Sequence, residues 1–182
     1  PCVVAHVNFG LRGSESDGDT QLVIQTCSDL SIPCFVKRID TEEYASENNL
    51  SIQMAARQIR YEFFQEILEG QKAYYIATAH HQDDELENFF IYLLRNQLHT
   101  AWQGIPMERG NIIRPLLNIP RKTIQEFASN NKVIFREDSS NASTKYLRNK
   151  IRHFLIPDVK NEYASVAEDF QYISSLSRLE SK

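Results

Sequence analysis

The order of apolar and polar positions predicts strands that alternate with helices. Short apolar runs rich in β-branched residues occur at 2–7, 33–39 and 73–79, as expected for buried strands. Between them, cap residues and acids at 14–17 predict a helix that runs to about residue 30. Ser51 can cap a second helix, at 51–70, which carries apolar residues at helical spacing. This alternation is typical of an α/β domain built on a parallel sheet with helices on both faces.

The second half continues in the same way and then becomes helical. We expect a helix at 81–97, a strand at 112–117, a helix at 121–130 and a short strand at 133–136. Apolar residues then recur every three or four positions through 158–176, which predicts an amphipathic C-terminal helix. The predicted fold is therefore a Rossmann-like, three-layer α/β domain followed by a helical C-terminal segment.

The clearest candidate for chemistry follows the strand predicted at 73–79, where ligands of parallel sheets bind. His80 and His81 lie there, and Asp84 and Glu87 follow, one helical turn apart. Such a group can bind a metal, transfer protons or hold a cationic amine. The acids also suit the first turn of a helix, so a purely structural role is an alternative. A metal hydrolase is a further alternative, but no second histidine–carboxylate cluster supports it, and we assign no metal ligands.

Two weaker candidates lie nearer the start of the chain. Residues 6–13 end the first strand with two glycines, which allow close backbone approach, and with Arg12, which can reach a phosphate. Arg57 and Arg60, three positions apart on one helix, share a face and repel unless an anion is near. Solvated arginines are the simpler interpretation of both.

Charge is unevenly distributed along the 182 residues. The whole chain has 20 basic and 24 acidic residues, but residues 114–152 alone hold 9 basic and 3 acidic ones, which gives +6. Arg148 and Arg152 lie four apart on one predicted helical face, with Tyr146 and Asn149 nearby. Basic side chains can neutralise RNA phosphates, and Tyr146 or Asn149 could contact a base or sugar. The alternative is a basic amphipathic helix that packs on its own domain.

Cysteine usage and hydropathy exclude other classes. Cys2, Cys27 and Cys34 form no C-x-x-C pair, which argues against a disulfide scaffold or zinc ribbon and favours a reducing, cytoplasmic compartment. The longest strictly apolar run, 89–94, is too short to span a bilayer, so we expect no membrane association.

In this order the motifs resemble the tRNA(Ile)-lysidine synthetase family of the N-type ATP pyrophosphatase (PP-loop) superfamily. The resemblance covers about residues 2–157. It rests on six blocks: HVNFGLRGSES from His6, AARQIRYEFF from Ala55, ATAHHQDDELEN from Ala77, IRPLLNIPRKTI from Ile113, REDSSN from Arg136 and YLRNKIRHFLIP from Tyr146.

The resemblance implies a ligase of the adenine nucleotide alpha-hydrolase (HUP) fold that acts in two steps. ATP, with Mg²⁺, adenylates the wobble cytidine of an isoleucine tRNA with a CAU anticodon and releases pyrophosphate. The ε-amine of free lysine then displaces AMP to form lysidine. A homo-oligomer is a further expectation.

The resemblance also implies residue roles. Asp84 and Glu87 would bind the lysine ammonium, and together with His81 and Arg148 they are the candidate catalytic residues. The nucleotide and its phosphates would contact His6, Val7, Asn8, Arg12, Arg57 and Arg60. The tRNA would contact Asn141, Tyr146, Arg148, Asn149 and Arg152.

The sequence departs from the family pattern in two ways. Phe9 stands where the family usually has a histidine, and the S-G-G-x-D-S phosphate loop of the superfamily does not occur in these residues. We therefore expect an N-terminally incomplete catalytic domain at 1–142, and at 143–182 a basic helical segment that leads to further domains. By itself such a chain would cleave ATP poorly.

Two alternatives share the same blocks. A PP-loop tRNA thiolase uses the same adenylation step but needs sulfur-handling cysteines, often as C-x-x-C. A non-catalytic RNA-binding module would use only the basic segment.

Overall fold

The computed structural model describes residues 2–139, 144 and 146–180, with side chains up to residue 177. The chain folds as two compact units, Pro1–Ile76 and Ala77–Lys182. No described helix combines the length and apolar character that crossing a bilayer requires.

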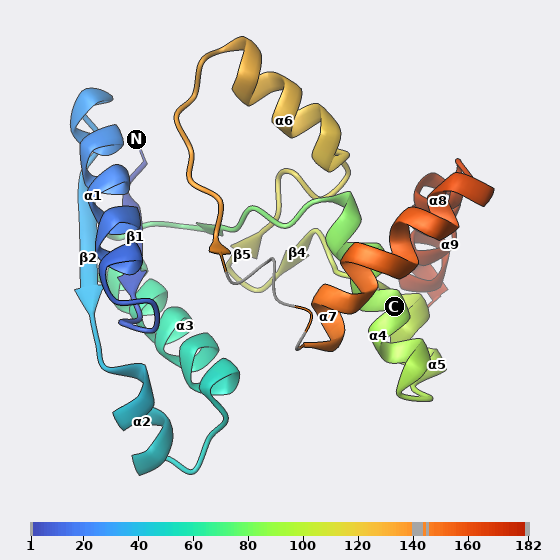
Figure 1. Ribbon diagram of the computed structural model, residues 1–182, viewed down its shortest axis with the longest axis horizontal. Coiled ribbons are helices and arrows are strands. Elements are labelled where there is room, and N and C mark those ends of the chain that lie inside the picture. Colours follow the sequence, from blue (N-terminus) through green and yellow to red (C-terminus); the bar gives the residue numbers. More distant parts are fainter. Residues whose placement is uncertain (1, 140–143, 145, 181–182) are drawn as a thin grey trace. The chain divides into compact units, whose positions relative to one another are not determined.

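The first unit is a parallel βαβ arrangement with two further helices. Strands β1 (Val4–Asn8) and β2 (Cys34–Arg38) pair in parallel, with Val4 opposite Cys34, and helix α1 (Ser14–Asp29) connects them. Helices α2 (Thr41–Glu47) and α3 (Ile52–Gly70) follow (Figure 1).

A small core holds β1 and α3 together. Val7 from β1 and Ile59 and Phe63 from α3 are buried against each other, and Phe9 and Phe35 pack on them. Ser51 caps α3 as the sequence predicts, because its side chain accepts a hydrogen bond from the backbone N–H of Met54 at 3.3 Å.

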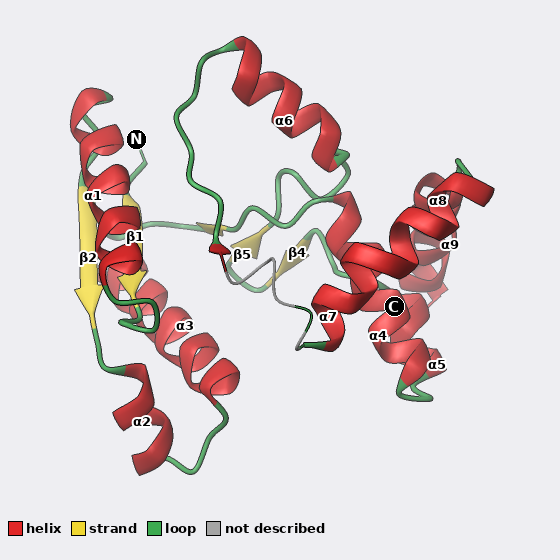
Figure 2. Cartoon of the chain, in the orientation of Figure 1, coloured by secondary structure: helices red, strands yellow, loops and turns green. Residues whose placement is uncertain are grey.

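The second unit is mostly helical (Figure 2). A three-stranded sheet has the order β3-β5-β4, from β3 (Ile76–Ala77), β5 (Ile112–Ile113) and β4 (Glu108–Arg109), with β4 and β5 antiparallel. The described helices are α4 (Gln82–Leu94), α5 (Leu98–Gln103), α6 (Arg121–Asn130), α7 (Leu147–Lys150), α8 (Ile156–Glu162) and α9 (Val166–Glu180), with a π-helical turn at Ile151–Leu155.

The core of this unit joins α4 to the C-terminal helices. Leu86 of α4 is buried with Ile151, Ile156 and Phe170. Phe170 of α9 also lies 4.8 Å, ring centre to ring centre, from Phe89 of α4. The C-terminal segment is therefore part of the unit that carries the first turn of α4.

The predicted fold class is confirmed: the chain is α/β with parallel strands, followed by a helical segment. Three predicted strands differ. Residues 73–79 form a strand only at Ile76–Ala77, residues 112–117 form one only at Ile112–Ile113, and 133–136 do not form a strand. The predicted domain boundary at 142/143 lies outside the described residues and stays a prediction.

Candidate functional site

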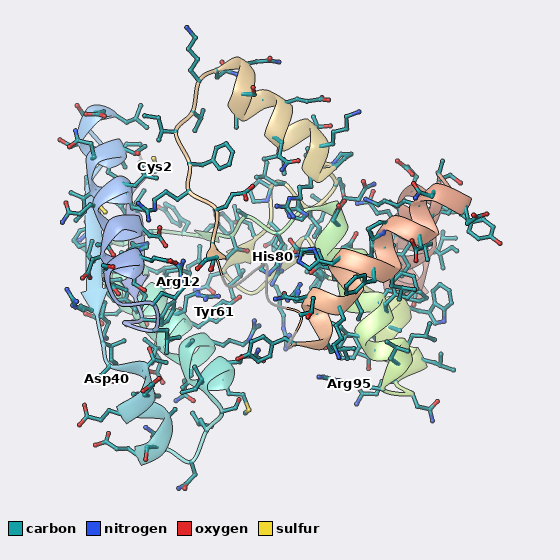
Figure 3. The ribbon with its side chains drawn as sticks, in the orientation of Figure 1. Cys2, Arg12, Asp40, Tyr61, His80 and Arg95 are labelled. Atoms are coloured by element: carbon teal, nitrogen blue, oxygen red, sulfur yellow. The ribbon has the colours of Figure 1, made fainter. Side chains whose placement is uncertain are left out.

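The first turn of α4 carries the acidic motif. His81 is the N-cap residue, and its backbone N–H donates to Asp84 Oδ2 at 3.0 Å, so one acid secures the start of the helix. Asp83, Asp84 and Glu85 all lie in this turn, where the helix dipole favours negative charge. The structural interpretation of these acids therefore holds for part of the cluster. His80 precedes the helix and shares a 2.9 Å hydrogen bond with Thr78 (Figure 3).

Asp84 and Glu87 meet the basic segment. Glu87 is only 1% exposed, and its carboxylate accepts from Arg148 Nε at 2.6 Å and from Arg152 Nε at 2.5 Å. Arg148 also donates to Asp84 Oδ1 at 3.3 Å, and a terminal nitrogen of Arg152 lies 3.8 Å from the same atom. The structure thus brings together two motifs some 60 residues apart in the sequence. We call these four residues the carboxylate–guanidinium cluster.

Local geometry places both arginines on one face, as their spacing predicts. Arg148 lies on α7, and Arg152 lies in the π-helical turn that follows, where Ile151 is buried beside Leu86. Pro157 lies at the start of α8, just after this turn, and has no backbone N–H to donate to it.

The electrostatics of the cluster are balanced. Its two carboxylates and two guanidiniums sum to zero, which is the condition for keeping Glu87 charged while buried. Hydrogen bonding to Glu87 raises the pKa of Arg152, despite partial burial. Arg148 is the more accessible arginine, with 42% of its side chain exposed against 21% for Arg152. Asp84 is the more accessible carboxylate, at 14% against 1% for Glu87.

The opposite side of α4 is fixed by residues that sequence reasoning missed. Glu85, also 1% exposed, accepts from the backbone N–H of Ile105 at 3.2 Å and from Gln171 Nε2 at 3.3 Å. Lys160 of α8 donates to Asp83 at 2.9 Å. Glutamine at 171 had no recognisable signal, because a lone polar residue in an amphipathic helix is ordinary in sequence.

The remaining candidate RNA contacts differ in accessibility. Tyr146 is 44% exposed, whereas Asn149 is 9% exposed. Asn141 lies outside the described residues.

The residues predicted to contact the nucleotide and its phosphates all lie in the first unit. His6 shares a 3.1 Å hydrogen bond with Thr20, and burial lowers the pKa of His6 against an opposing effect of Asp19. Asn8 is buried and donates to Asp17 at 2.9 Å, while its side-chain oxygen accepts from the backbone N–H of Gly10. Val7 is buried, and its side chain belongs to the core.

The three arginines of the first unit with predicted phosphate roles have different partners. Arg12, at the turn before α1, pairs with Asp19 at 2.5 Å and Glu15 at 3.3 Å. Arg57 and Arg60 of α3 lie against aromatic rings: Arg57 over Tyr61 at 4.8 Å and Arg60 over Phe9 at 5.3 Å. Figure 3 labels Arg12 and Tyr61.

Comparison with known proteins identifies the family of this chain. The family model described as "PP-loop domain" matches residues 1–159. The chain belongs to the PP-loop domain family.

Two curated relatives of this chain carry the same name. It is 40% identical over 167 residues to a tRNA(Ile)-lysidine synthase of Porphyromonas gingivalis, covering 91% of this chain and 37% of that protein. It is 38% identical over 176 residues to the tRNA(Ile)-lysidine synthase of Bacillus subtilis, covering 94% of this chain and again 37% of the relative. The resemblance identified in the sequence is thereby confirmed, and the chain spans little more than a third of the length of these relatives.

A solved structure shares the fold. The U34-tRNA thiolase NcsA from Methanococcus maripaludis, with its 4Fe-4S cluster, superposes with a TM-score of 0.71 at 13% identity, covering 95% of this chain and 61% of the thiolase. At this identity the likeness concerns the fold alone.

Proposed function

We propose that this chain carries catalytic residues of a tRNA(Ile)-lysidine synthase, which joins free lysine to the wobble cytidine of an isoleucine tRNA at the expense of ATP. The observation that carries the proposal is the carboxylate–guanidinium cluster, in which groups suited to an amine and groups suited to RNA phosphate are in contact. The names of the curated relatives support the same activity. We further propose a cytoplasmic location, and a homo-oligomer stays a prediction.

In the first proposed step, a cytidine oxygen attacks the α-phosphorus of ATP, and the bond to pyrophosphate breaks. Arg57 and Arg60 are proposed to contact phosphate oxygens, since guanidinium groups suit phosphate geometry. His6, Val7, Asn8 and Arg12 stay proposed contacts of the nucleotide. Arg12 would have to exchange Asp19 and Glu15 for phosphate.

In the second proposed step, the ε-amine of lysine attacks the adenylated carbon, a C–N bond forms, and AMP leaves with the C–O electron pair. The amine must first lose a proton, and Asp84 is the proposed acceptor because its carboxylate is the more accessible of the two. His81 is proposed to assist by orienting Asp84: its N–H binds Asp84 Oδ2, and its ring Nδ1 lies 3.5 Å from the same oxygen.

The balanced charge of the cluster suggests how RNA and lysine cooperate. An ammonium gains little from a cluster of zero net charge. If RNA phosphates attract Arg148 and Arg152, negative charge is left on Asp84 and Glu87, which then favours the ammonium. Tyr146 and Asn149 are proposed to contact the tRNA nearby, and Asn141, outside the described residues, stays a predicted tRNA contact.

The described residues offer no site that would hold Mg²⁺ by protein side chains alone. They contain no group of three or more His, Cys, Asp or Glu side chains arranged to hold a metal, and Asp84 and Glu87 already face guanidiniums. No step of the proposal is therefore assigned to Mg²⁺, although the resemblance implies it as the companion of ATP.

The thiolase alternative has weaker support. The likeness to the thiolase concerns the fold alone and does not favour either activity. Cys27 is buried and Cys2 is exposed, and no metal-holding group that includes them occurs among the described residues. A non-catalytic RNA-binding module would need only Arg148 and Arg152, and leaves the buried carboxylates without a chemical role.

The test compares Asp84→Asn with Asp83→Asn in the full-length protein. Asp84→Asn should abolish lysine incorporation while adenylation of the tRNA, followed as pyrophosphate release, is better preserved. Asp83→Asn removes the same charge from an acid paired with Lys160 and should stay close to wild type. Equal loss of both steps in Asp84→Asn would contradict a lysine-specific role, and lysine-independent RNA binding without AMP release would favour the binding module.

A further inference from the structure

Two arginines of the first unit have aromatic rings, rather than acids, as partners. Arg12 pairs with Asp19 and Arg38 with Asp17. In contrast, neither Arg57 nor Arg60 forms an ion pair within the part of the chain that the structure describes. Acids are plentiful here: the unit has 11 acidic and 6 basic residues, so the lack of an acid beside these two is a specific feature.

Each guanidinium lies over a ring at cation–π distance. The Cζ atom of Arg57 is 4.8 Å from the centre of the Tyr61 ring, one turn ahead on α3. The Cζ atom of Arg60 is 5.3 Å from the centre of the Phe9 ring, which follows β1. Both separations are within the roughly 6 Å over which the ring quadrupole attracts a cation.

Both rings are held in place by the core. Phe9 packs against the buried cluster of Val7, Ile59 and Phe63, and its carbonyl accepts from the buried Thr41 hydroxyl at 2.8 Å. Tyr61 makes an edge contact with Phe64, with 6.2 Å between ring centres, and Phe64 packs on the same cluster.

A ring holds a cation without cancelling its charge, whereas a carboxylate would cancel it. The two guanidiniums therefore keep their positive charge and lie close to each other on one helix. Burial lowers the pKa of Arg60; Tyr61 acts against this effect, and the charge of Arg57 acts with it. An anion between or beside them would relieve both effects.

We infer that Phe9 and Tyr61 are positioning residues that hold Arg60 and Arg57 ready for phosphate oxygens. The inference rests on the proposed function, in which these arginines contact phosphate. It also assigns a role to Phe9: a neutral ring face holds Arg60, whereas a protonated histidine at this position would repel it.

The test measures affinity for inorganic tripolyphosphate by calorimetry in the full-length protein. Phe9→Leu should raise the Kd about threefold, because the cation–π contact is lost and the guanidinium of Arg60 is no longer held in position for phosphate. Phe9→Tyr keeps the ring face and should bind as wild type does. Tyr61→Leu and Tyr61→Phe form the same pair for Arg57.

A double-variant cycle separates positioning from packing. In an Arg60→Ala background, Phe9→Leu should cause no further loss of affinity, because the group that Phe9 positions is gone. Lys37→Ala serves as the charge control, since Lys37 lies over Phe63 but also pairs with Glu66. It should leave the Kd unchanged.

The outcomes are distinct. Unchanged affinity in Phe9→Leu and Tyr61→Leu, or an equal loss from Phe9→Leu with and without Arg60, overturns the inference while the phosphate role of the arginines survives. Unchanged affinity in Arg57→Ala and Arg60→Ala overturns the phosphate role and the inference with it. Parallel titrations with ATP and with a single-stranded RNA show which of the two ligands supplies the phosphate that the arginines bind. A lower affinity for either ligand in the leucine variants supports the inference.

Discussion

Glu87 is a carboxylate held where water hardly reaches it. Its oxygens receive three guanidinium N–H contacts within 3.0 Å, two of them from Arg152. A buried charge is tolerated only when such partners replace its hydration. Asp83, one helical turn earlier, pairs with Lys160 in a more accessible place: 20% of the Asp83 side chain and 33% of the Lys160 side chain are exposed. The two acids should therefore differ in their effect on stability.

Replacing Glu87 by alanine should lower the free energy of unfolding by about 3 kcal/mol, because it leaves two guanidiniums facing only Asp84. Asp83→Ala should cost less than about 1 kcal/mol, as partly exposed ion pairs do. Urea unfolding of the two variants measures the difference. Equal losses would contradict the buried-charge argument.

His6 should make stability depend on pH. Burial lowers its pKa in the folded protein below the ordinary value of 6.5, against the opposing effect of Asp19. Below pH 6.5 the unfolded chain therefore binds more protons than the folded one, and stability falls as the pH is lowered. The midpoint of urea unfolding should drop more steeply between pH 6.5 and 5.5 in wild type than in His6→Gln. His99→Gln, which changes an exposed histidine, serves as the control for removing a histidine elsewhere in the chain.

Helix α4 is held by polar contacts on two of its sides. Asp84 and Glu87 face the arginines, while Gln82 and Glu85 bond to Gln171 of α9. The buried Leu86 lies in the hydrophobic core of the second unit. The amphipathic C-terminal helix thus sets the position of the turn that carries the acids.

Gln171→Ala should destabilise the second unit by about 1–2 kcal/mol, because it removes a hydrogen-bond donor from the buried carboxylate of Glu85. Tyr172→Ala changes the adjacent residue, which is 67% exposed, and should stay within about 0.5 kcal/mol of wild type. Urea unfolding followed by Trp102 fluorescence compares them. A larger effect from Tyr172 would show that α9 is held by other contacts.

For the whole molecule, the positive charge counted along the sequence overstates the free positive charge of the folded protein. The +6 of residues 114–152 counts Arg148 and Arg152, whose charge is balanced by Asp84 and Glu87. The second unit as a whole has 14 basic and 13 acidic residues. When the lysine ammonium pairs with these carboxylates, the positive charge of the two arginines is no longer balanced, and the affinity for RNA should increase. By linkage, RNA should increase the affinity for lysine.

This coupling is measurable as the Kd for lysine in the full-length protein with and without an anticodon stem-loop RNA. We expect at least a fivefold tighter Kd with RNA, a modest value for coupled sites. Arg148→Ala should bind lysine more tightly than wild type without RNA and lose most of the coupling. Equal lysine affinity with and without RNA would exclude the exchange of partners.

Local signals in the sequence predicted many elements correctly. The helix expected at 121–130 is α6 with the same bounds, and the predicted Ser51 cap starts α3. Helix α2 was missed, although Asp40 accepts hydrogen bonds from the N–H groups of Glu42 and Glu43 and the signal was readable. The apolar run at 73–79 predicted a longer strand than forms, since strand length depends on a partner that the run itself does not specify.

The amino-acid sequence is enough to predict the α/β class, the family resemblance, and the spacing that puts Arg148 with Arg152 and Asp84 with Glu87 on shared helical faces. These follow from periodicity and from motifs, which are local. Three features emerge in the folded chain: the two pairs bind each other, Glu85 and Gln171 hold α4 from its other side, and Phe9 lies under Arg60. The physical reason is that charge balance and ring contact depend on distances of a few ångströms between residues far apart in the chain, and no spacing along the chain sets those distances.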